Sequence, residues 1–350
     1  MNVRQKKKQD PLEAAKEAFR RAQMDAAGID LSWIQPPPGS SNWPLAPDAL
    51  RLAMALARAT GARHVIEFGS GLSTRGLARA LSEAGSRRAI SSVDHDPDFG
   101  AAARRAYEAE PAAGVRVRFQ IAPVVMRDCG GELMPVYAVN PARLATRRPA
   151  DFVLIDGPPE LLGGRQGTLY QLMPFVRRGT IVLLDDAGRA HERRILRDWE
   201  QDLGDVIEVL QRSDSSKGMA ALLVREPVLP AGLWEHRATL TARELLAAVP
   251  PEAPVALVDD GTWGAALLPG RKVHAFIERH GEYWGPPASD EEALEELDAL
   301  RERGVRFLAL TWPSFWWLDH YPRFGVRLLE HHACVIRNPR LRLFDLRAPP

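Results

Sequence analysis

The stretch VIEFGSGLSTRGLA, residues 65–78, decides how this chain folds. It begins as an apolar run that is typical of a buried strand, turns through Gly69, Ser70 and Gly71, and continues as a helix. Glycines are needed at such a turn because the backbone bends sharply and approaches a ligand closely. The helix that follows presents free N–H groups at its start, and these accept anionic or hydroxyl-rich groups. We therefore predict a ligand-binding turn between a strand and a helix.

Strand and helix patterns alternate on both sides of this turn. Helix patterns separate apolar strand-like runs at 64–68, 89–94, 115–124, 151–156 and 180–186, and a hairpin pair follows at 205–213 and 218–226. Strands that alternate with helices form a parallel sheet covered on both faces. The sequence therefore predicts an α/β fold, with a doubly wound, mostly parallel, seven-stranded, Rossmann-like sheet.

The length of 350 residues suggests two domains, and proline-rich stretches mark the boundaries. After the second of these stretches, Ser289 and Glu292 form a capping box that starts a helix between two further strand patterns. We therefore expect a second, smaller α/β domain. The predicted division is an N-terminal arm at 1–45, the main domain at 46–226, a linker at 227–250 and the small domain at 251–350.

Composition excludes several classes of protein. The 46 Lys and Arg residues balance 45 Asp and Glu residues. The chain therefore lacks the surplus of basic residues that would predict nucleic-acid binding. The two cysteines, Cys129 and Cys334, lie far apart in the sequence and indicate a reducing, cytoplasmic location. The basic N-terminus lacks the apolar region of a signal peptide, and no apolar run is long enough for a transmembrane segment. A homo-oligomer is compatible with this composition.

Two residues distinguish the turn from one that binds a dinucleotide. Thr74 stands where the third glycine of G-x-G-x-x-G belongs, and Glu67 precedes the first glycine by two positions. A carboxylate is unfavourable beside a pyrophosphate but suits a ligand with an amino group and a sulfonium charge. An NAD-dependent oxidoreductase is therefore disfavoured, although a generic Rossmann-like domain for another nucleotide stays open as an alternative.

Together with the acidic strand end SVDHDP at 92–97, this turn resembles the class I S-adenosylmethionine-dependent methyltransferase family. The resemblance extends over residues 48–226. It implies that Asp94 binds the ribose hydroxyls, with His95 beside it, although Asp94 could also be a solvated acid at a strand end. The cofactor-binding residues implied in this way are Glu67, Gly69, Ser70, Gly71, Ser73, Thr74, Asp94, His95 and Asp156.

Three acidic residues end two neighbouring strand patterns. Asp156 ends one, and Asp185 and Asp186 end the next, so their carboxylates should converge at the carboxyl edge of the sheet. Converging carboxylates repel each other unless a cation or a proton joins them. The arrangement is similar to divalent-metal-dependent O-methyltransferases, which implies that Asp156, Asp185 and Asp186 hold Mg²⁺ or another divalent metal. Asp186 departs from the asparagine that is usual in small catechol-type enzymes. The alternative is that these acids shape the pocket, contact substrate or cap a helix.

The general base is less clearly marked, because GPPE follows Asp156 where catechol-type enzymes carry a catalytic lysine. By position, the catalytic candidates are Asp156, Glu160 and His191, and His95 is a further candidate for the base. For Glu160 and the two histidines a structural or surface role is the alternative. Arg165 and Arg189 could hold an anionic substrate or simply be solvated.

The predicted small domain concentrates five tryptophans: Trp263, Trp284, Trp312, Trp316 and Trp317. They could form a stacking platform for a sugar, or they could fill the core of a small domain. The segments HGEYWGPPASD and WPSFWWLDHYP resemble tails of bacterial glycan-related enzymes. We therefore expect O-methylation of a saccharide or of a glycosylated or other small metabolite. The alternative is a non-catalytic binding or scaffold protein of a glycan-assembly system with a methyltransferase-like fold.

Overall fold

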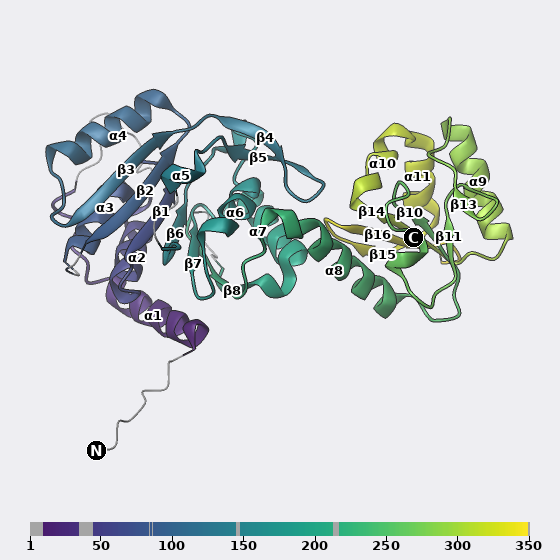
Figure 1. Cartoon of the computed structure of the whole chain (residues 1–350), viewed down its shortest axis with the longest axis horizontal. Helices are drawn as coiled ribbons and strands as arrows, with labels where there is room; N and C mark the ends of the chain where they lie inside the picture. Colours follow the sequence, from purple (N-terminus) through teal and green to yellow (C-terminus); the bar gives the residue numbers. More distant parts are fainter. Residues whose placement is uncertain are drawn as a thin grey trace, which may run out of the picture. The chain divides into compact units, whose positions relative to one another are not determined.

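The computed structural model describes residues 10–34, 45–83, 85, 87–144, 148–212 and 217–348. It divides into two compact units (Figure 1). Unit 1 comprises Met1–Cys129 with Leu133–Pro230, and unit 2 comprises Gly130–Glu132 with Ala231–Pro350. Among the described residues, none of the helices combines the length and the apolar composition that crossing a membrane requires.

The core of unit 1 is a seven-stranded sheet in the order β3-β2-β1-β6-β7-β9-β8. Its strands are β1 (His64–Phe68), β2 (Arg88–Asp94), β3 (Val115–Ile121), β6 (Phe152–Ile155), β7 (Ile181–Leu184), β8 (Ile207–Gln211) and β9 (Ala220–Val224). All neighbouring pairs are parallel except those that β9 makes with β7 and β8. The predicted mostly parallel, doubly wound sheet is confirmed, and its strand order reverses direction between β1 and β6.

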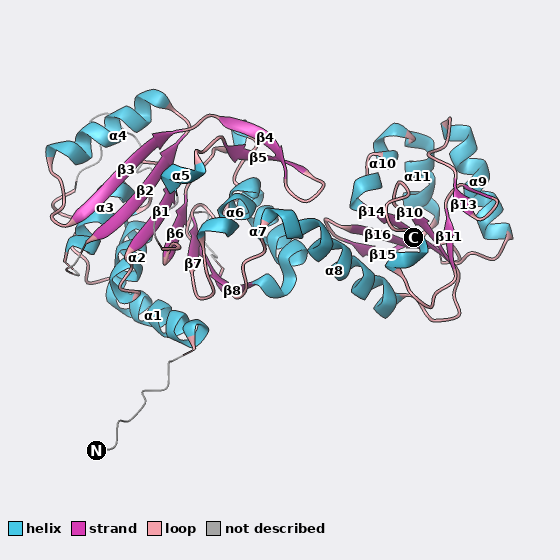
Figure 2. Cartoon of the chain, in the orientation of Figure 1, coloured by secondary structure: helices cyan, strands magenta, loops and turns pink. Residues whose placement is uncertain are grey.

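Helices cover this sheet on both faces (Figure 2). They are α1 (Pro11–Ala26), α2 (Pro47–Ala59), α3 (Leu72–Ser82), α4 (Pro97–Ala109), α5 (Pro141–Leu144), α6 (Gln166–Leu172) and α7 (Ala190–Leu203). Val65 and Leu154 point into the core cluster that α1, α2 and α3 share. Ile66 and Ile155, on the opposite face, are also fully buried. Burial on both faces explains why these strands are continuous apolar runs rather than alternating ones.

Two helices lie differently from the predicted division of the chain. Leu12 and Phe19 of α1 belong to the core of unit 1, so this part of the predicted arm is packed. Helix α8 (Leu233–Ala248) lies wholly inside the predicted linker at 227–250, yet its Leu245 and the following Val249 belong to a core cluster of unit 2. In both cases an amphipathic helix beside a proline-rich stretch buries its apolar face. Prolines in the flanking sequence do not prevent this packing.

The strand pattern at 115–124 is interrupted. After β3, Pro123 separates off β4 (Val124–Asp128), which pairs antiparallel with β5 (Leu133–Tyr137) in a separate hairpin. Proline has no backbone N–H to donate to a neighbouring strand, so β3 ends before it. Strand β5 was not predicted, because Pro135 within LMPVY argues against a strand.

Unit 2 is a smaller α/β fold, as predicted. Its five-stranded sheet has the order β11-β10-β14-β16-β15. The first three strands are parallel to one another, and β16 is antiparallel to both of its neighbours, β14 and β15. Ser289 caps the central helix by accepting a hydrogen bond from the Glu292 N–H at 3.2 Å. The elements are β10 (Val255–Val258), β11 (Val273–Ala275), β12 (Glu278–Arg279), β13 (Glu282–Tyr283), α9 (Asp290–Glu302), β14 (Phe307–Thr311), α10 (Trp317–His320), α11 (Pro322–His331), β15 (Ala333–Arg337) and β16 (Leu341–Asp345).

The turn between β1 and α3 is held by a buried carboxylate. Oε2 of Glu67 accepts hydrogen bonds from the hydroxyls of Thr74 at 2.6 Å and Ser92 at 2.8 Å. Gly69 has a φ of +98°, and a Cβ there would lie 2.6 Å from the Asp156 carbonyl oxygen. Glu67 therefore joins β1 to β2 and α3, while Gly69 lets the turn approach the end of β6.

Burial raises the pKa of Glu67 from 4.5 to about 7, and hydrogen bonds from Ser73, Thr74 and Ser92 oppose the shift. Between these two pH values the folded protein binds a proton that the unfolded chain has lost. The contribution of Glu67 to the free energy of unfolding therefore decreases as pH rises through this window and does not change further above it.

The variant Glu67→Gln has no such titration. Its free energy of unfolding relative to the natural protein should rise by up to about 3 kcal/mol between pH 5 and pH 8. Urea unfolding at both pH values measures this difference, and any pH-independent cost of the amide cancels. Glu110→Gln, at a side chain that is 69% exposed, is the matched control and should show no such change. An equal stability difference at both pH values would contradict the assignment.

Candidate functional site

A cavity of about 350 Å³ lies in unit 1 where the sheet order reverses, at the carboxyl ends of β1, β2 and β6. Open α/β sheets bind ligands at such a switch point, and the volume suits a small-molecule ligand. The cavity is lined by Gly69, Ser70, Asp94, His95, Asp96, Phe99, Tyr137, Asp156, Gly157, Pro159, Glu160, Arg165, Arg189 and Glu192.

The predicted cofactor residues fall into two groups. Those that line the cavity are Gly69, Ser70, Asp94, His95 and Asp156. The others, Glu67, Gly71, Ser73 and Thr74, are not among the lining residues. Thr74 lies beneath the turn, where its hydroxyl accepts a hydrogen bond from the Gly71 N–H at 3.1 Å and donates to Glu67. This second group therefore shapes the turn that the first group presents to the cavity.

Asp94 ends β2 and is 3% exposed. Its Oδ2 accepts a hydrogen bond from the Ser70 N–H at 2.8 Å, and its Oδ1 accepts one from the Asp96 N–H at 2.9 Å. Nδ1 of His95 lies 3.4 Å from Oδ1. Because a carboxylate offers about four lone-pair positions, Asp94 can hold the turn and still accept hydrogen bonds from a ligand.

Tyr137 and Phe99 line the cavity but were not predicted. Tyr137 comes from the unpredicted strand β5 and stacks on Phe68 with ring centroids 5.3 Å apart. Its hydroxyl is buried and has no hydrogen-bond partner among the described residues. A side chain at Gly157 would collide with this hydroxyl, so glycine is required there. An unsatisfied buried hydroxyl at a cavity wall is suited to bind a ligand.

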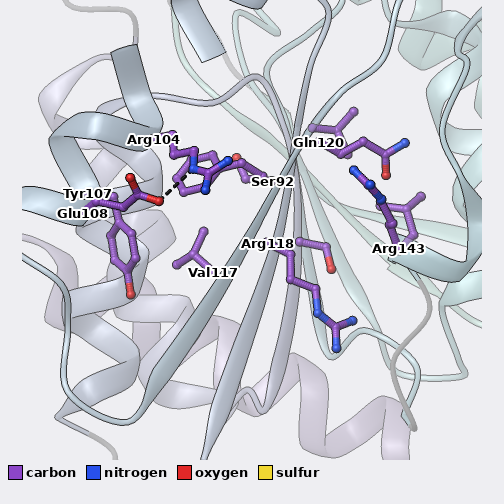
Figure 3. Close-up of a pocket in the computed structure, with 12 residues that line it drawn as sticks. Ser92, Arg104, Tyr107, Glu108, Val117, Arg118, Gln120 and Arg143 are labelled. Atoms are coloured by element: carbon purple, nitrogen blue, oxygen red, sulfur yellow. Dashed lines mark hydrogen bonds and ion pairs between the residues drawn. The ribbon is translucent and has the colours of Figure 1, made fainter. Parts of the chain in front are cut away.

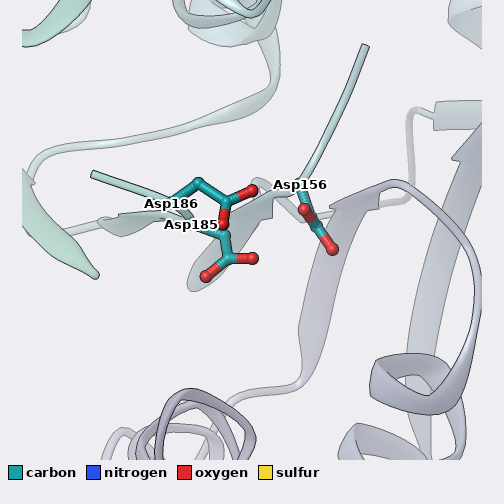
Figure 4. Close-up of side chains that lie close together, drawn as sticks. All are labelled: Asp156, Asp185 and Asp186. Carbon is teal, nitrogen blue, oxygen red and sulfur yellow. The ribbon is translucent and has the colours of Figure 1, made fainter. Parts of the chain in front are cut away.

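The three acids predicted as metal ligands are brought together. Asp156, Asp185 and Asp186 each offer a carboxylate oxygen, and these oxygens lie within 4.8 Å of one another (Figure 4). Asp156 faces the cavity, whereas Asp185 and Asp186 are buried and do not line it. Asp186 also has a positive φ of 57°, which is uncommon for a residue other than glycine.

A buried arginine occupies the centre of this acidic cluster. Nη2 of Arg165 lies 3.0 Å from Oδ1 of Asp156 and 3.1 Å from Oδ2 of Asp186. Its Nη1 donates to the Asp185 carbonyl oxygen and lies 3.8 Å from Oε1 of Glu192. The predicted metal ligands therefore do not fit a divalent ion as they are arranged, because a guanidinium already takes up two of their carboxylates.

Burial and repulsion by neighbouring carboxylates raise the pKa values of Asp156 and Asp185. Burial and the neighbouring Asp185 raise the pKa of Asp156 well above its ordinary value, although Arg165 opposes the shift. Burial and then Asp186 raise the pKa of Asp185 to about 6. The cluster therefore tends to hold a proton, and Asp156 is a stronger base than an ordinary aspartate when it is ionised.

The two other catalytic candidates lie at or beyond the rim. Glu160, in the short 3₁₀ helix Glu160–Leu162, lines the cavity with a side chain that is 69% exposed. His191 does not line the cavity, and its Nε2 is buried against Gly164. Nδ1 of His191 lies 3.4 Å from Glu160 and 3.0 Å from Nη2 of Arg194. Of the three candidates, only Asp156 combines burial with access to the cavity.

A second cavity, of about 310 Å³, lies against β2 and β3 (Figure 3). Arg104, Arg118 and Arg143 are among the residues that line it. Apart from Ser92 and Val93 of the SVDHDP motif, its lining shares no residue with the glycine turn or with the strand-end acids. The convergence of predicted residues therefore singles out the cavity at the switch point.

Comparison with known proteins gives one family match, which lies in unit 1. Residues 66–187 match a family model described as a methyltransferase domain. No curated protein sequence matches the chain.

Solved structures with a similar fold have low identities and low TM-scores. An O-methyltransferase from Bacillus cereus in complex with S-adenosylhomocysteine is 17% identical, with 63% of this chain and 94% of that chain covered and a TM-score of 0.37. The O-methyltransferase TomG from Streptomyces achromogenes is 20% identical, with 63% and 91% covered and a TM-score of 0.36. A putative RNA methyltransferase from Pyrococcus horikoshii is 11% identical, with 60% and 99% covered and a TM-score of 0.34.

Among these comparisons, the match to the family model is the one that bears on the kind of domain. Its range includes the turn after β1 and the ends of β2, β6 and β7, which supply Gly69, Asp94, Asp156 and Asp185. The match shows that residues 66–187 are similar to a methyltransferase domain, and most of the residues that line the cavity lie in this range.

Proposed function

We propose that this chain is an S-adenosylmethionine-dependent methyltransferase that methylates a hydroxyl oxygen of a saccharide or of a glycosylated or other small metabolite. The observation that carries the proposal is the cavity at the switch point, which lies inside the matched methyltransferase domain. Its wall combines the glycine turn with the strand-end acids Asp94 and Asp156. Carboxylates around a cavity favour a cationic ligand, and S-adenosylmethionine carries a sulfonium and an amino group.

In this proposal the chain's residues bind and orient the cofactor. The Gly69–Ser70 turn lies against one side of it, and Asp94 accepts hydrogen bonds from its ribose hydroxyls. Phe99 is 46% exposed and offers an apolar face at the cavity, while the Tyr137 hydroxyl supplies a buried polar group. When bound, the cofactor supplies the methyl group that is transferred.

Methyl transfer needs alignment more than it needs a strong base. Bound S-adenosylmethionine would supply the methyl carbon and a sulfur leaving group that keeps the bonding pair, so the chain's residues would need to align the acceptor oxygen with that carbon. The hydroxyl proton must then leave, and Asp156 is the candidate best placed to receive it. Glu160 at the rim can pass the proton to solvent, whereas His191 lies outside the cavity and acts at most through Glu160.

Asp94→Asn should weaken S-adenosylmethionine binding at least tenfold, or about 1.4 kcal/mol, because the amide is uncharged and has fewer acceptor positions for the ribose. Isothermal titration calorimetry with the cofactor measures the change. Asp98→Asn is the matched control, since Asp98 is exposed in the first turn of α4 and does not line the cavity. Absence of binding by the unaltered protein would overturn the proposed function, and unchanged affinity in Asp94→Asn would remove its role.

The saccharide part of the proposal rests on unit 2. Of its five predicted tryptophans, Trp312 and Trp317 are buried, and Trp263 packs beside a core cluster. Trp284, which is 60% exposed, and Trp316, which is 41% exposed, are left at the surface. Exposed tryptophan rings stack on the apolar faces of sugars, so the predicted platform is reduced to these two residues. The same surface would serve the alternative function, a non-catalytic glycan-binding or scaffold protein.

Transfer of a labelled methyl group to a panel of mono- and oligosaccharides, with catechol for comparison, tests the acceptor class. We expect transfer to a member of the saccharide panel. Trp284→Ala should then raise KM about threefold or more with little change in kcat, because stacking on the ring is lost. Leu329→Ala, at another exposed apolar side chain of unit 2, is the control. Transfer to catechol alone would contradict the saccharide proposal, and saccharide binding without any methyl transfer would favour the scaffold alternative.

A further inference from the structure

The acidic cluster beneath the cavity contains its own cation. Arg165 immediately precedes α6, and its side chain is only 6% exposed. Its guanidinium lies among carboxylates from the ends of β6 and β7 and from α7. The contacts join it to Asp156, to Asp186 and, at 3.8 Å, to Glu192.

The donors of Arg165 are largely used by these groups. Nη2 donates to Asp156 and Asp186, and Nη1 donates to the Asp185 carbonyl oxygen. Nε is buried without a partner among the described residues. Because arginine stays protonated in proteins and its planar fork matches carboxylates, this arrangement carries a permanent positive charge.

A divalent metal would have to bind beside a guanidinium that already contacts Oδ1 of Asp156 and Oδ2 of Asp186. A second arginine, Arg189, also lies 3.0 Å from that oxygen of Asp186. Oδ2 of Asp185 and Oδ1 of Asp186 are buried without a partner among the described residues, so the metal would be opposed by the charge of the arginines rather than by a lack of oxygens. The two other acids of the set, Asp185 and Asp186, lie behind the cavity wall. A metal held by them would therefore be separated from an acceptor by Arg165 and Asp156.

We propose that Arg165 is the resident cation of this acidic cluster, in the place where metal-dependent O-methyltransferases hold a divalent ion, and that the site works without a metal. Arg165 acts as a positioning residue, which holds Asp156 at the cavity wall and balances the charge of Asp186. The catalytic part of this inference rests on the proposed methyltransferase function. The charge arrangement itself does not.

Mn²⁺ binding, measured by electron paramagnetic resonance on the full chain, tests the charge arrangement without any assay of activity. The unaltered protein should not bind Mn²⁺ at this site, with a dissociation constant weaker than about 1 mM. Arg165→Ala leaves Asp156, Asp185 and Asp186 without their central cation and should bind Mn²⁺ at least tenfold more tightly. Arg165→Lys retains the charge and should exclude the ion as the unaltered protein does.

Two matched variants identify the site. Arg189→Ala removes the half-exposed arginine that contacts the same carboxylate and should leave Mn²⁺ excluded. Adding Asp185→Asn to Arg165→Ala should abolish the new binding. The inference is overturned if the unaltered protein binds Mn²⁺ and Asp185→Asn removes that binding. It is also overturned if folded Arg165→Ala binds no more Mn²⁺ than the unaltered protein. Should Arg165→Ala fail to fold, the unaltered protein and Asp185→Asn alone decide the matter.

The catalytic part has a separate readout. Methyl transfer should be unchanged after EDTA treatment, and added Mg²⁺ should not increase it. Loss of transfer with EDTA and its recovery with Mg²⁺ would overturn metal independence. Failure of the protein to bind S-adenosylmethionine in calorimetry would instead overturn the proposed function, while the Mn²⁺ result would still stand.

Discussion

The ion pairs of Arg165 with Asp156 and Asp186 are the interaction on which the candidate site depends. The two aspartates follow adjacent parallel strands, so the fold itself forces their charges together. Removing one partner of a buried charge pair typically costs about 3–5 kcal/mol, because the other charge is left uncompensated. Without the guanidinium, the ends of β6 and β7 would have to protonate or separate, and the cavity wall that Asp156 forms would change.

Glu67 shows the other way in which this domain buries an acid. Among the described residues its side-chain partners are hydroxyls, those of Ser73, Thr74 and Ser92, and burial raises its pKa to about 7. Hydroxyl groups donate well-placed hydrogen bonds to this carboxyl group but carry no positive charge. They therefore hold the turn without favouring the ionised form as strongly as a cation would. Arg165 gives charge as well, and its cluster can keep several carboxylates at one place. One arrangement fixes the turn after β1, and the other fixes the end of the neighbouring strand β6.

Much of the fold and part of the site follow from local sequence patterns. Short apolar runs between helices predict the parallel sheet, and glycines after β1 predict the ligand-binding turn. The carboxyl ends of parallel strands share an edge, so the meeting of Asp156 with Asp185 and Asp186 is also predictable. Other features are not predictable, because they depend on packing between distant residues. Tyr137 reaches the cavity from a hairpin whose second strand contains Pro135, a residue that argues against a strand. Trp312 and Trp317 are core residues, although their sequence also suits an exposed platform.

The sequence by itself determined the α/β architecture, the two units, and the acidic and glycine-rich composition of one sheet edge, since hydrophobic periodicity and the succession of elements along the chain are local properties. Only the tertiary structure decided which cation balances that edge. Arg165 stands nine residues after Asp156 and 21 before Asp186, and nothing in that spacing shows that its guanidinium turns back among their carboxylates. That choice depends on where α6 starts relative to the ends of β6 and β7. A side chain of fixed positive charge is drawn there because buried carboxylates are costly without one.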